Sequence, residues 1–462
     1  MSPTSTDAGA DERRFRRALA FTVATLAVLC IVFLGLGYLQ GPKLASAQVD
    51  VDAVTSQSGQ QLRLFANQAV AHVDEKQVSV TPAVPFSVST TGDVIAVQFD
   101  QRLDYATNYT VSVAGVTSVY LAQPATVDYS FTTGTPDLFY LDRGEPDDAI
   151  VSTGISGAAR QVIYSARHIQ DFAVLATTFA VVTLADDHTS SLSLVSRAGD
   201  VTEPLLLPDT GSIRDLDAAA SGSLFGFTLT SAAAGLGQLN ASTLYTYDIT
   251  TGRRTVEPVL GLDGRPMNVL GWQFVPGTNT IIALNIDRSL ILVDPATKTV
   301  TPLGQYQELD KVSPDGSVVT VTDSNGAASY DLATGTETRL TASPLQGAQG
   351  FLGATQVLAN GDRVEKVVIP DATGTRFSSL LVYDDGTSSR VLYQTPNGLG
   401  SINDFSVSPN GQYVAIETVP DAASSVSDGY YYDARATSVT TVIVALDSGA
   451  QTRSVEGFAL QW

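Results

Sequence analysis

Hydrophobic and polar residues follow two different patterns along this chain, and the change of pattern separates its parts. Between Ala18 and Leu39 the sequence is apolar and uncharged. At about 1.5 Å per residue, a helix over this run is long enough to cross a hydrocarbon layer of about 30 Å. Beyond it, runs of Val, Ile, Leu, Tyr, Phe and Thr alternate with polar residues and are separated by Gly, Asn, Asp and Pro. This pattern is typical of β-strands, so the rest of the chain is predicted to be all-β, without amphipathic helices.

The flanks of the apolar run predict its orientation in a membrane. The stretch RRFRR at 13–17 precedes the run, whereas Lys43 is the one basic residue close behind it. Positively charged flanks stay in the cytoplasm. We therefore expect residues 1–17 to be a cytoplasmic tail, 18–39 a single transmembrane signal-anchor helix, and 40–47 a linker. The bulk of the chain is then extracytoplasmic.

A cleaved signal peptide is the alternative interpretation of the same segment. Ala45 and Ala47 form a small-residue cleavage site of the usual kind. Cleavage after Ala47 would release the protein from the cell membrane. The apolar run is longer than the core of a typical signal peptide, which favours the uncleaved anchor.

The composition excludes several functions for the exported part. With 47 acidic and 26 basic residues, the chain has a formal net charge of −21, which repels nucleic acid. Cys30 is the one cysteine and lies in the apolar run, so disulfides and thiol chemistry are excluded outside the membrane. His72 falls in a different predicted domain from His168 and His188, and no hydrolase or phosphate-binding motif occurs. We predict no catalytic residue, no metal and no cofactor.

The first β domain is predicted over residues 48–134. The segments VIAVQF (Val94–Phe99), NYTVSV (Asn108–Val113) and DYSFTTG (Asp128–Gly134) alternate with a period of two, as strands of a β-sandwich do. The stretch from LDYATNYTVSV to YSFTT resembles the end of bacterial Ig-like domains of the S-layer type. The matching residues are Leu103, Thr107, Tyr109, Val111, Val113, Phe131, Thr132 and Thr133. The resemblance implies an Ig-like sandwich that acts as a spacer or adhesive module.

Two recurring phrases organise residues 136–462. KVSPDGSVVTVT at 311–322 returns as FSVSPNGQYVAI at 405–416, and FVPGTN at 274–279 is a looser copy. The second phrase is a strand, an aspartate, a short turn and another strand. An aspartate at the head of a turn can accept a hydrogen bond from the backbone two residues further on. We interpret five aspartates in this way: Asp248, Asp294, Asp331, Asp384 and Asp447.

Each cycle of these phrases predicts a four-stranded antiparallel meander. The spacing of the cycles matches β-propeller blades, and the SPDG and SPNG turns resemble the TolB-type β-propeller repeat. Inner strands are expected to start near Asp171, Asp215, Val269, Leu309, Gly350 and Asn403. The segment PDLFYLD at 136–142 lacks an inner strand before it, and GFALQW at 457–462 resembles one. We therefore expect the last strand to complete the first blade and close the ring. Seven blades are predicted, with six or eight as alternatives.

The same topology predicts which loops meet a ligand. Loops from the second to the third strand, and connections between blades, share one face, and the long insertions fall there. The longest, at 420–438, offers aromatic surface and charge that suit a glycan or a protein: its candidate residues are Tyr430, Tyr431, Tyr432, Asp433 and Arg435. The alternative is that one or two of these tyrosines begin the third strand and pack between blades.

A second loop on this face carries the other candidate residues. In ADDHTSS at 185–191, Asp186, Asp187 and His188 combine carboxylates with an imidazole. They are candidates for ligand binding through a proton or cation site. The alternative is a solvated surface loop.

Together these features predict a membrane-anchored binding or scaffolding protein of the bacterial cell envelope, with an envelope protein or a glycan as its partner. One alternative is a cell-wall polymer hydrolase that uses loop-face carboxylates, which two acids about 5–10 Å apart in a cleft would support. Another is the ectodomain of a sensory complex, which would need a partner to carry the signal because residues 1–17 contain no domain.

Overall fold

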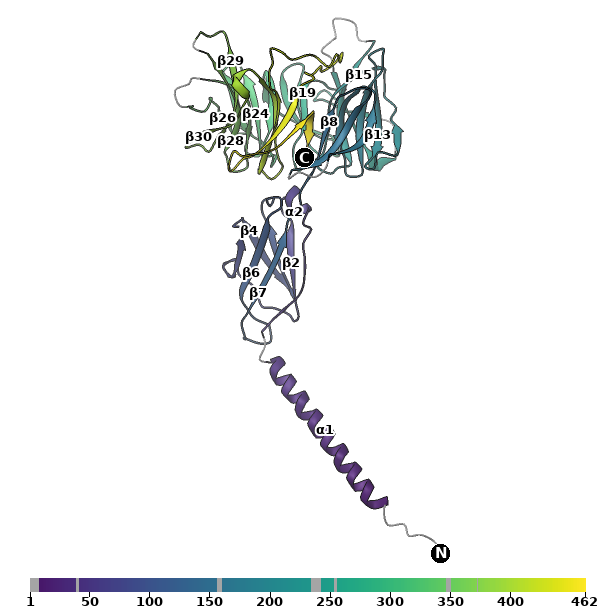
Figure 1. The fold of residues 1–462 in the computed structure, drawn as a ribbon, viewed down its shortest axis with the longest axis vertical. Coiled ribbons are helices and arrows are strands. Elements are labelled where there is room, and N and C mark those ends of the chain that lie inside the picture. Colours follow the sequence, from purple (N-terminus) through teal and green to yellow (C-terminus); the bar gives the residue numbers. More distant parts are fainter. Residues whose placement is uncertain are drawn as a thin grey trace. The chain divides into compact units, whose positions relative to one another are not determined.

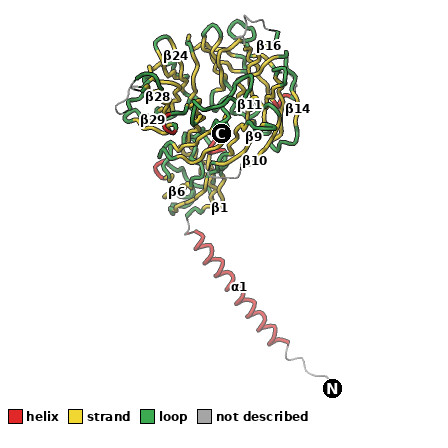
Figure 2. Tube along the Cα trace, turned by 45° about the horizontal axis from the view of Figure 1, so that its top comes forward, coloured by secondary structure: helices red, strands yellow, loops and turns green. Residues whose placement is uncertain are grey.

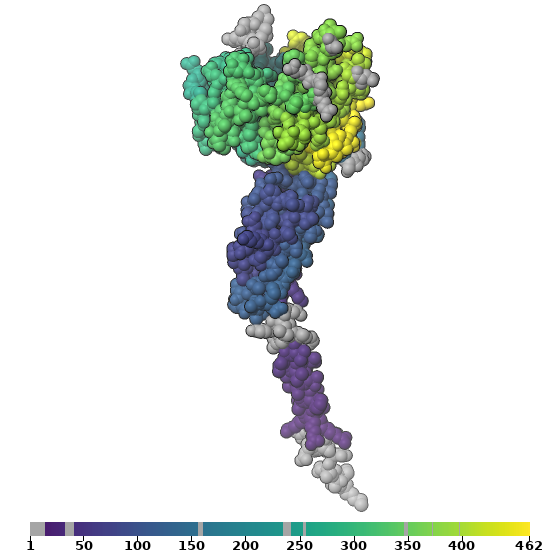
Figure 3. Space-filling view, turned by 90° about the vertical axis from the view of Figure 1, so that its left-hand side faces the viewer, coloured from purple at the N-terminus to yellow at the C-terminus, as the bar shows by residue number. Residues whose placement is uncertain are grey.

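The computed structural model describes residues 8–38, 41–155, 160–233, 242–252, 256–345, 350–371 and 373–462. The chain divides into two compact units, Met1–Gly134 and Thr135–Trp462. Strands dominate both units (Figure 2). Figure 3 shows their side-chain surfaces, coloured along the sequence.

Helix α1 (Ala8–Tyr38) is the apolar segment at the start of the first unit (Figure 1). Its part from Arg14 to Val32 is long and apolar enough to cross a membrane, and none of this part is buried. The helix begins earlier than the predicted start at Ala18, because the arginine-rich stretch before the apolar run continues the same helix. Of the predicted tail, residues 1–7 lie outside the described part of the chain.

The rest of the first unit consists of two antiparallel sheets around one hydrophobic core. One sheet has the order β1 (Leu44–Gln48), β2 (Gln61–Ala66), β5 (Val94–Phe99), β4 (Phe86–Thr91), and the other β3 (Val78–Thr81), β6 (Asn108–Val116), β7 (Ala125–Thr132). Burial alternates along β2, β5 and β6, so one face of each strand lines the core. The short helices α2 (Ala53–Ser56) and η1 (Glu75–Gln77) lie between strands.

The structure corrects the predicted linker at 40–47. Residues 44–48 form β1, which pairs with β2 through Leu44 and Ala66 and through Ala47 and Leu64. Leu44 and Ala47 also pack against the core. The small residues of LASAQ carry no strand signal of their own. The edge of β2 nevertheless has backbone groups that a neighbouring strand can satisfy.

The residues that resemble Ig-like domains form a hydrogen-bonded corner. The Tyr109 side chain is fully buried, and its hydroxyl accepts a hydrogen bond from the backbone N–H of Asp104 at 3.1 Å. The Thr133 hydroxyl donates to the carbonyl of Asp104 at 2.6 Å and accepts from the N–H of Thr107 at 2.9 Å. A tyrosine whose hydroxyl binds the backbone a few residues upstream is a recurring feature of Ig sandwiches.

The second unit is a β-propeller built from antiparallel groups of four strands. In the described residues there are seven groups, and the strands of each run in this order from the first strand outward: β35 (Phe458–Gln461), β8 (Asp137–Asp142), β9 (Asp148–Gly154), β10 (Gln161–Ala166); β11 (Ile169–Val174), β12 (Thr178–Leu184), β13 (Ser190–Ser196), β14 (Thr202–Pro204); β15 (Gly211–Ala218), β16 (Leu224–Ser231), β17 (Ser242–Asp248), β18 (Glu257–Pro258); β19 (Asn268–Phe274), β20 (Ile281–Asn285), β21 (Ser289–Asp294), β22 (Thr299–Gln305); β23 (Glu308–Val312), β24 (Val318–Asp323), β25 (Gly326–Asp331), β26 (Glu337–Arg339); β27 (Phe351–Val357), β28 (Arg363–Pro370), β29 (Phe377–Asp384), β30 (Ser389–Gln394); and β31 (Ser401–Val407), β32 (Tyr413–Val419), β33 (Thr440–Ala445), β34 (Gln451–Glu456). Each predicted inner-strand start falls within, or one residue before, a first strand.

The last strand completes the first group, as predicted. β35 pairs with β8, with Phe458 opposite Leu141 and Gln461 opposite Phe139. Phe458 is 3% exposed and belongs to a hydrophobic cluster that includes side chains of both β8 and β11. Strands from the two ends of the unit therefore share one sheet and one core.

Side-chain hydrogen bonds join the first strands of neighbouring groups into a closed circuit, which we call the axial ties. Every first strand contains a register shift, and such bulges redirect nearby side chains. The ties are Gln461 to the N–H of Val174, Asp171 to the N–H of Leu216, Asp217 to the N–H of Phe274, Gln273 to the carbonyl of Asp310, Asp310 to the N–H of Thr355, Gln356 to the N–H of Val407, and Trp462 to the hydroxyl of Ser406.

The repeated phrases build the tight turns of the propeller. In SPDG the hydroxyl oxygen of buried Ser313 accepts hydrogen bonds from the N–H groups of Ser317 and Val318, and Gly316 has φ 76°. Ser408 of SPNG does the same. A left-handed glycine and a capping hydroxyl explain why the phrase recurs.

The turn aspartates of the second phrase accept an N–H two residues further on, as predicted: Asp248, Asp294, Asp331 and Asp384. Asp447 differs and accepts the N–H of Ser448.

Replacing Phe458 with Ala should weaken the closure of the ring. Removing this buried ring leaves a cavity between β35, β8 and β11, and Phe→Ala changes in cores cost about 3–5 kcal/mol. Urea unfolding followed by intrinsic fluorescence measures the loss. Phe377→Ala is the matched control, because Phe377 is 58% exposed. Equal unfolding midpoints for the two variants would show that Phe458 does not hold the ring closed.

Candidate ligand-binding site on the loop face

A cavity of about 700 Å³ opens between four connections of the propeller. Three are loops from a second to a third strand (β8–β9, β12–β13 and β32–β33), and one is the connection between groups from β10 to β11. These are the kinds of connection that the topology predicts on one face. A second cavity of about 350 Å³ shares Tyr431 and His188 with the first.

The long loop between β32 and β33 folds back on itself as an irregular hairpin. Ser427 forms a β-bridge with Ala436, and the N–H of Asp428 donates to the carbonyl of Arg435 at 2.8 Å. The third strand, β33, begins only at Thr440. The alternative in which one or two of the tyrosines begin the third strand is therefore wrong, and all three lie in the loop.

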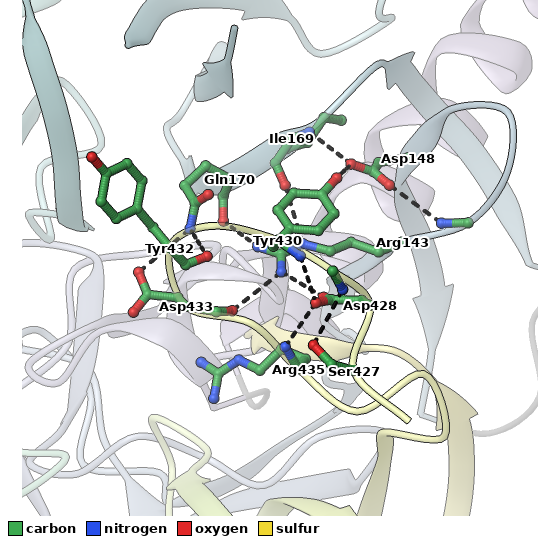
Figure 4. Close-up of polar contacts among 12 residues, drawn as sticks. Arg143, Asp148, Ile169, Gln170, Ser427, Asp428, Tyr430, Tyr432, Asp433 and Arg435 are labelled. Carbon is green, nitrogen blue, oxygen red and sulfur yellow. Dashed lines mark hydrogen bonds and ion pairs between the residues drawn. The ribbon is translucent and has the colours of Figure 1, made fainter. Parts of the chain in front are cut away.

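Buried Arg143 from the β8–β9 loop fastens this hairpin to the propeller (Figure 4). Its guanidinium forms an ion pair with Asp428 at 2.8 Å, and the two side chains are only 4% and 9% exposed. It also donates to the carbonyls of Ile169, Gln170 and Asp433. The ring centroid of Tyr430 lies 3.7 Å from the guanidinium carbon, and that of Phe458 lies 4.8 Å from it. A buried charge is stable only when it is paired and hydrogen-bonded, and Arg143 meets that condition through contacts to the hairpin.

Tyr430 is held by Asp148, which begins β9. The Asp148 carboxylate accepts the N–H of Ile169 at 2.7 Å, the N–H of Gly144 at 3.2 Å and the hydroxyl of Tyr430. Burial raises the pKa of Asp148, while these hydrogen bonds oppose the rise. Burial and the bond to Asp148 also raise the pKa of Tyr430. Tyr430 is therefore a hydrogen-bond donor at neutral pH, and its polar group is used within the protein.

Tyr431 is the tyrosine that remains accessible. Its side chain is 63% exposed. The ring stacks on the imidazole of His188, with the centroids 4.0 Å apart and the planes within 10°. The Tyr432 ring contacts the Tyr431 ring edge to face, with the centroids 4.7 Å apart, and the guanidinium of Arg214 lies 5.0 Å from the Tyr432 ring. The two loops that the sequence suggested separately thus meet at Tyr431 and His188, where the two cavities adjoin.

Asp433 and Arg435, also predicted from the sequence, contact the protein and line neither cavity. Asp433 has φ 48° and accepts a hydrogen bond from the Gln170 amide at 3.4 Å. Arg435 forms an ion pair with Glu417 at 3.2 Å.

On the second loop, Asp187 accepts the hydroxyl and the N–H of Thr189, and these bonds lower the pKa of Asp187. Asp186 lines the larger cavity.

Charged residues and a histidine that were not among the predicted site residues also line the larger cavity. They are Arg143, Glu145, Asp148, Arg167, His168 and Asp428. Arg143, Glu145 and Asp148 come from DRGEPDD at 142–148, a charged stretch that follows the predicted strand at 136–142 and leads into β9. Its place between a second and a third strand was a usable signal, because such loops share the ligand-facing side.

Four carboxylates line this cavity, and two of them, Asp148 and Asp428, hold the loop; Glu145 and Asp186 are the other two. Asp148 accepts three hydrogen bonds, and Asp428 binds Arg143 and the N–H groups of Tyr430 and Arg435. Within the described ranges, no group of three or more His, Cys, Asp or Glu residues is arranged to hold a metal ion.

Comparison with known proteins gives a general likeness of fold. No protein-family model matches the chain, and no similar curated protein was found. Similar solved structures include the β-propeller domain of the Trilobed protease from Pyrococcus furiosus (10% identity over 74% of this chain and 92% of that chain, TM-score 0.44). TolB from Acinetobacter baumannii has 13% identity over 83% of this chain and 82% of its own, with a TM-score of 0.37.

A periplasmic gluconolactonase of Pseudomonas aeruginosa has 12% identity over 71% of this chain and 99% of its own, with a TM-score of 0.42. The similar structures thus include enzymes as well as TolB. At these low identities and TM-scores they carry no conclusion about function. The propeller assignment rests on the strand pairing described above.

Arg143→Ala should release the hairpin from the propeller. The change leaves Asp428 buried without its partner, and breaking a buried ion pair costs about 3–5 kcal/mol. Hydrogen exchange should show lost protection at the amides of Asp428 and Thr437, which the hairpin holds. Arg265→Ala is the control, since the Arg265 side chain is 84% exposed. Unchanged exchange in Arg143→Ala would contradict the anchoring role.

The ionised carboxylate of Asp171 is repelled by those of Asp215 and Asp433, so this repulsion depends on pH. Burial raises the pKa of Asp171 from 3.8 to about 7, and the charges of Asp215 and Asp433 add to the rise. At a pH between these two pKa values, the folded protein therefore keeps a proton on Asp171 that the unfolded chain has already lost. Stability from this group is full below the ordinary pKa and is lost as the pH rises through about 7.

Asp433→Asn should remove part of this repulsion at alkaline pH only. Relative to wild type, the variant should gain stability as the pH rises from 5 toward 8, since Asp171 is protonated in the folded protein at the lower pH. Asn tolerates a positive φ, so the backbone can stay as it is. Urea titrations at several pH values measure the difference, with Asp263→Asn as the exposed control. A difference that is the same at every pH would refute this coupling.

Proposed function

We propose that this chain is a membrane-anchored, extracytoplasmic binding protein of the bacterial cell envelope. The exposed apolar stretch Arg14–Val32 supports the anchor, and the arginines before it favour a cytoplasmic N-terminus. The Tyr109 corner supports an Ig-like identity for the first unit. The closed circuit of axial ties supports a seven-bladed ring.

The ligand site we propose is centred on Tyr431. The observation that carries it is an exposed tyrosine stacked on His188 at the junction of two cavities. Its loop is fastened by the buried Arg143–Asp428 pair. A rigid aromatic group in a cleft loses little conformational entropy on binding, and such groups dominate binding energies. The partner is an envelope protein or an envelope glycan, both of which pack on tyrosine rings.

A hydrolytic function is the weaker candidate. Glycoside hydrolysis needs two carboxylates that can reach the substrate as acid and base or nucleophile. Asp148 and Asp428 already bind Tyr430 and Arg143. Both carboxylates therefore act as positioning groups for the Tyr431 loop in this proposal.

The test is a single substitution at the accessible tyrosine. Full-length protein in nanodiscs is assayed against purified envelope polysaccharides and against solubilised envelope proteins. Tyr431→Ala should weaken binding by about tenfold or more, as loss of a central aromatic contact does, whereas Tyr431→Phe should retain most of it. A triple replacement would mislead, because Tyr430 holds Asp148. Wild-type affinity in Tyr431→Ala would place the site elsewhere.

A further inference from the structure

The loop between β6 and β7 of the first unit ends in an exposed apolar tip. Val119 is 55% exposed and Tyr120 is 81% exposed, the highest value among the large apolar side chains of the first unit that the structure describes. The stretch VYLAQP at 119–124 carries no charge. The chain as a whole has a formal net charge of −21. An uncharged, exposed apolar tip therefore suits a partner surface that is itself apolar or uncharged.

The tip lies close to the point where the chain leaves α1. Gly41 packs directly on the end of this loop, since a Cβ at Gly41 would lie 2.8 Å from the carbonyl oxygen of Gln123 and 2.9 Å from the Cβ of Ala125. Tyr38, the last residue of α1, is three residues before Gly41. Three residues span at most about 11 Å. The loop is therefore tied by the covalent chain to the end of the apolar helix, whatever the angle between them.

The loop is held in place at its base. Val119 donates its N–H to the carbonyl of Ala69, and Ala71 donates to the carbonyl of Thr117. On the other side, the N–H of Lys43 donates to the side chain of Asn67 at 2.9 Å. The exposed tip is thus presented on a fixed backbone next to the chain exit.

The chemistry of this end suits the boundary of a lipid bilayer. Tyr is enriched at the interface because its ring is apolar and its hydroxyl is polar, and Lys43 is exposed there. Asp74, Glu75, Lys76 and Asp93 are also exposed around this end of the unit. The three acids outnumber the two lysines, and this balance favours uncharged lipid headgroups over anionic ones.

We propose that the tip Val119–Pro124 is a second membrane contact, in which Val119 and Tyr120 enter the headgroup region beside α1. This inference rests on the proposed anchoring by α1. The contact would restrain the motion of the first unit at the membrane surface. Its partner is the lipid surface itself.

The experiment uses an environment-sensitive fluorophore on single cysteines of the full-length protein in phosphatidylcholine nanodiscs. One sample carries the label on the native Cys30 in α1. Another carries Cys30→Ser with Ala122→Cys, which leaves Val119 and Tyr120 intact. The matched control carries Cys30→Ser with Gln101→Cys, an exposed loop position at the opposite end of the strands. Nanodiscs with spin labels on the lipid headgroup supply the quencher.

The label at residue 122 should show blue-shifted emission and strong quenching by headgroup spin labels, and the label at 101 should show neither. Adding Tyr120→Asp to the 122 sample should reduce the quenching, because a charge at the tip opposes insertion. If residues 122 and 101 give the same water-like emission while Cys30 is in lipid, the second contact is refuted and the anchor stands. If the Cys30 label is itself outside the lipid, the anchor fails and this inference fails with it.

Discussion

Closure of the ring is the constraint on which the candidate site depends. Residues Arg143 and Asp428 are 285 positions apart in the sequence and form a buried ion pair. They meet because β35 pairs with β8 and brings the last group of strands beside the first. Side-chain hydrogen bonds join neighbouring first strands around the ring. At the point of closure, Gln461 of β35 binds Val174 of β11, and Trp462, directly after β35, binds Ser406 of β31. A ring that opened at this point would separate the loops that line both cavities.

The hairpin at 426–437 crosses from the last group of strands to the first, second and third. It contacts Arg143 of the first group, Gln170 and His188 of the second, and Arg214 of the third. Tyr431 is exposed on this hairpin, and the buried pair of Arg143 and Asp428 holds the hairpin to the first group. The arrangement separates two tasks among three consecutive tyrosines. Tyr430 fixes the loop, Tyr432 packs against Arg214, and Tyr431 is exposed at the centre of the proposed ligand site.

Much of the fold was predictable because its turns have local chemistry. The serine, aspartate and glycine of SPDG form the turn by themselves, and four of the five turn aspartates bind the backbone as expected. The strand β1 was missed because LASAQ has no strand signal and pairs only through the exposed edge of β2.

The site was predictable only in part. The loop face follows from strand order, and Tyr431 and His188 were candidates on it. Their contact depends on how far each loop reaches across the ring, which no local pattern encodes. Arg143 was missed for the same reason, since its partner Asp428 is remote in the sequence.

The most direct test of this account is the hydrogen exchange of β35 in the intact protein. If the last strand closes the ring, peptides covering residues 458–461 and 137–142 should exchange slowly and together, at rates close to those of a buried strand such as β16. Rapid exchange at 458–461, with slow exchange elsewhere in the propeller, would show an open ring. The meeting of Arg143 with Asp428, and with it the proposed site, would then lose its structural basis.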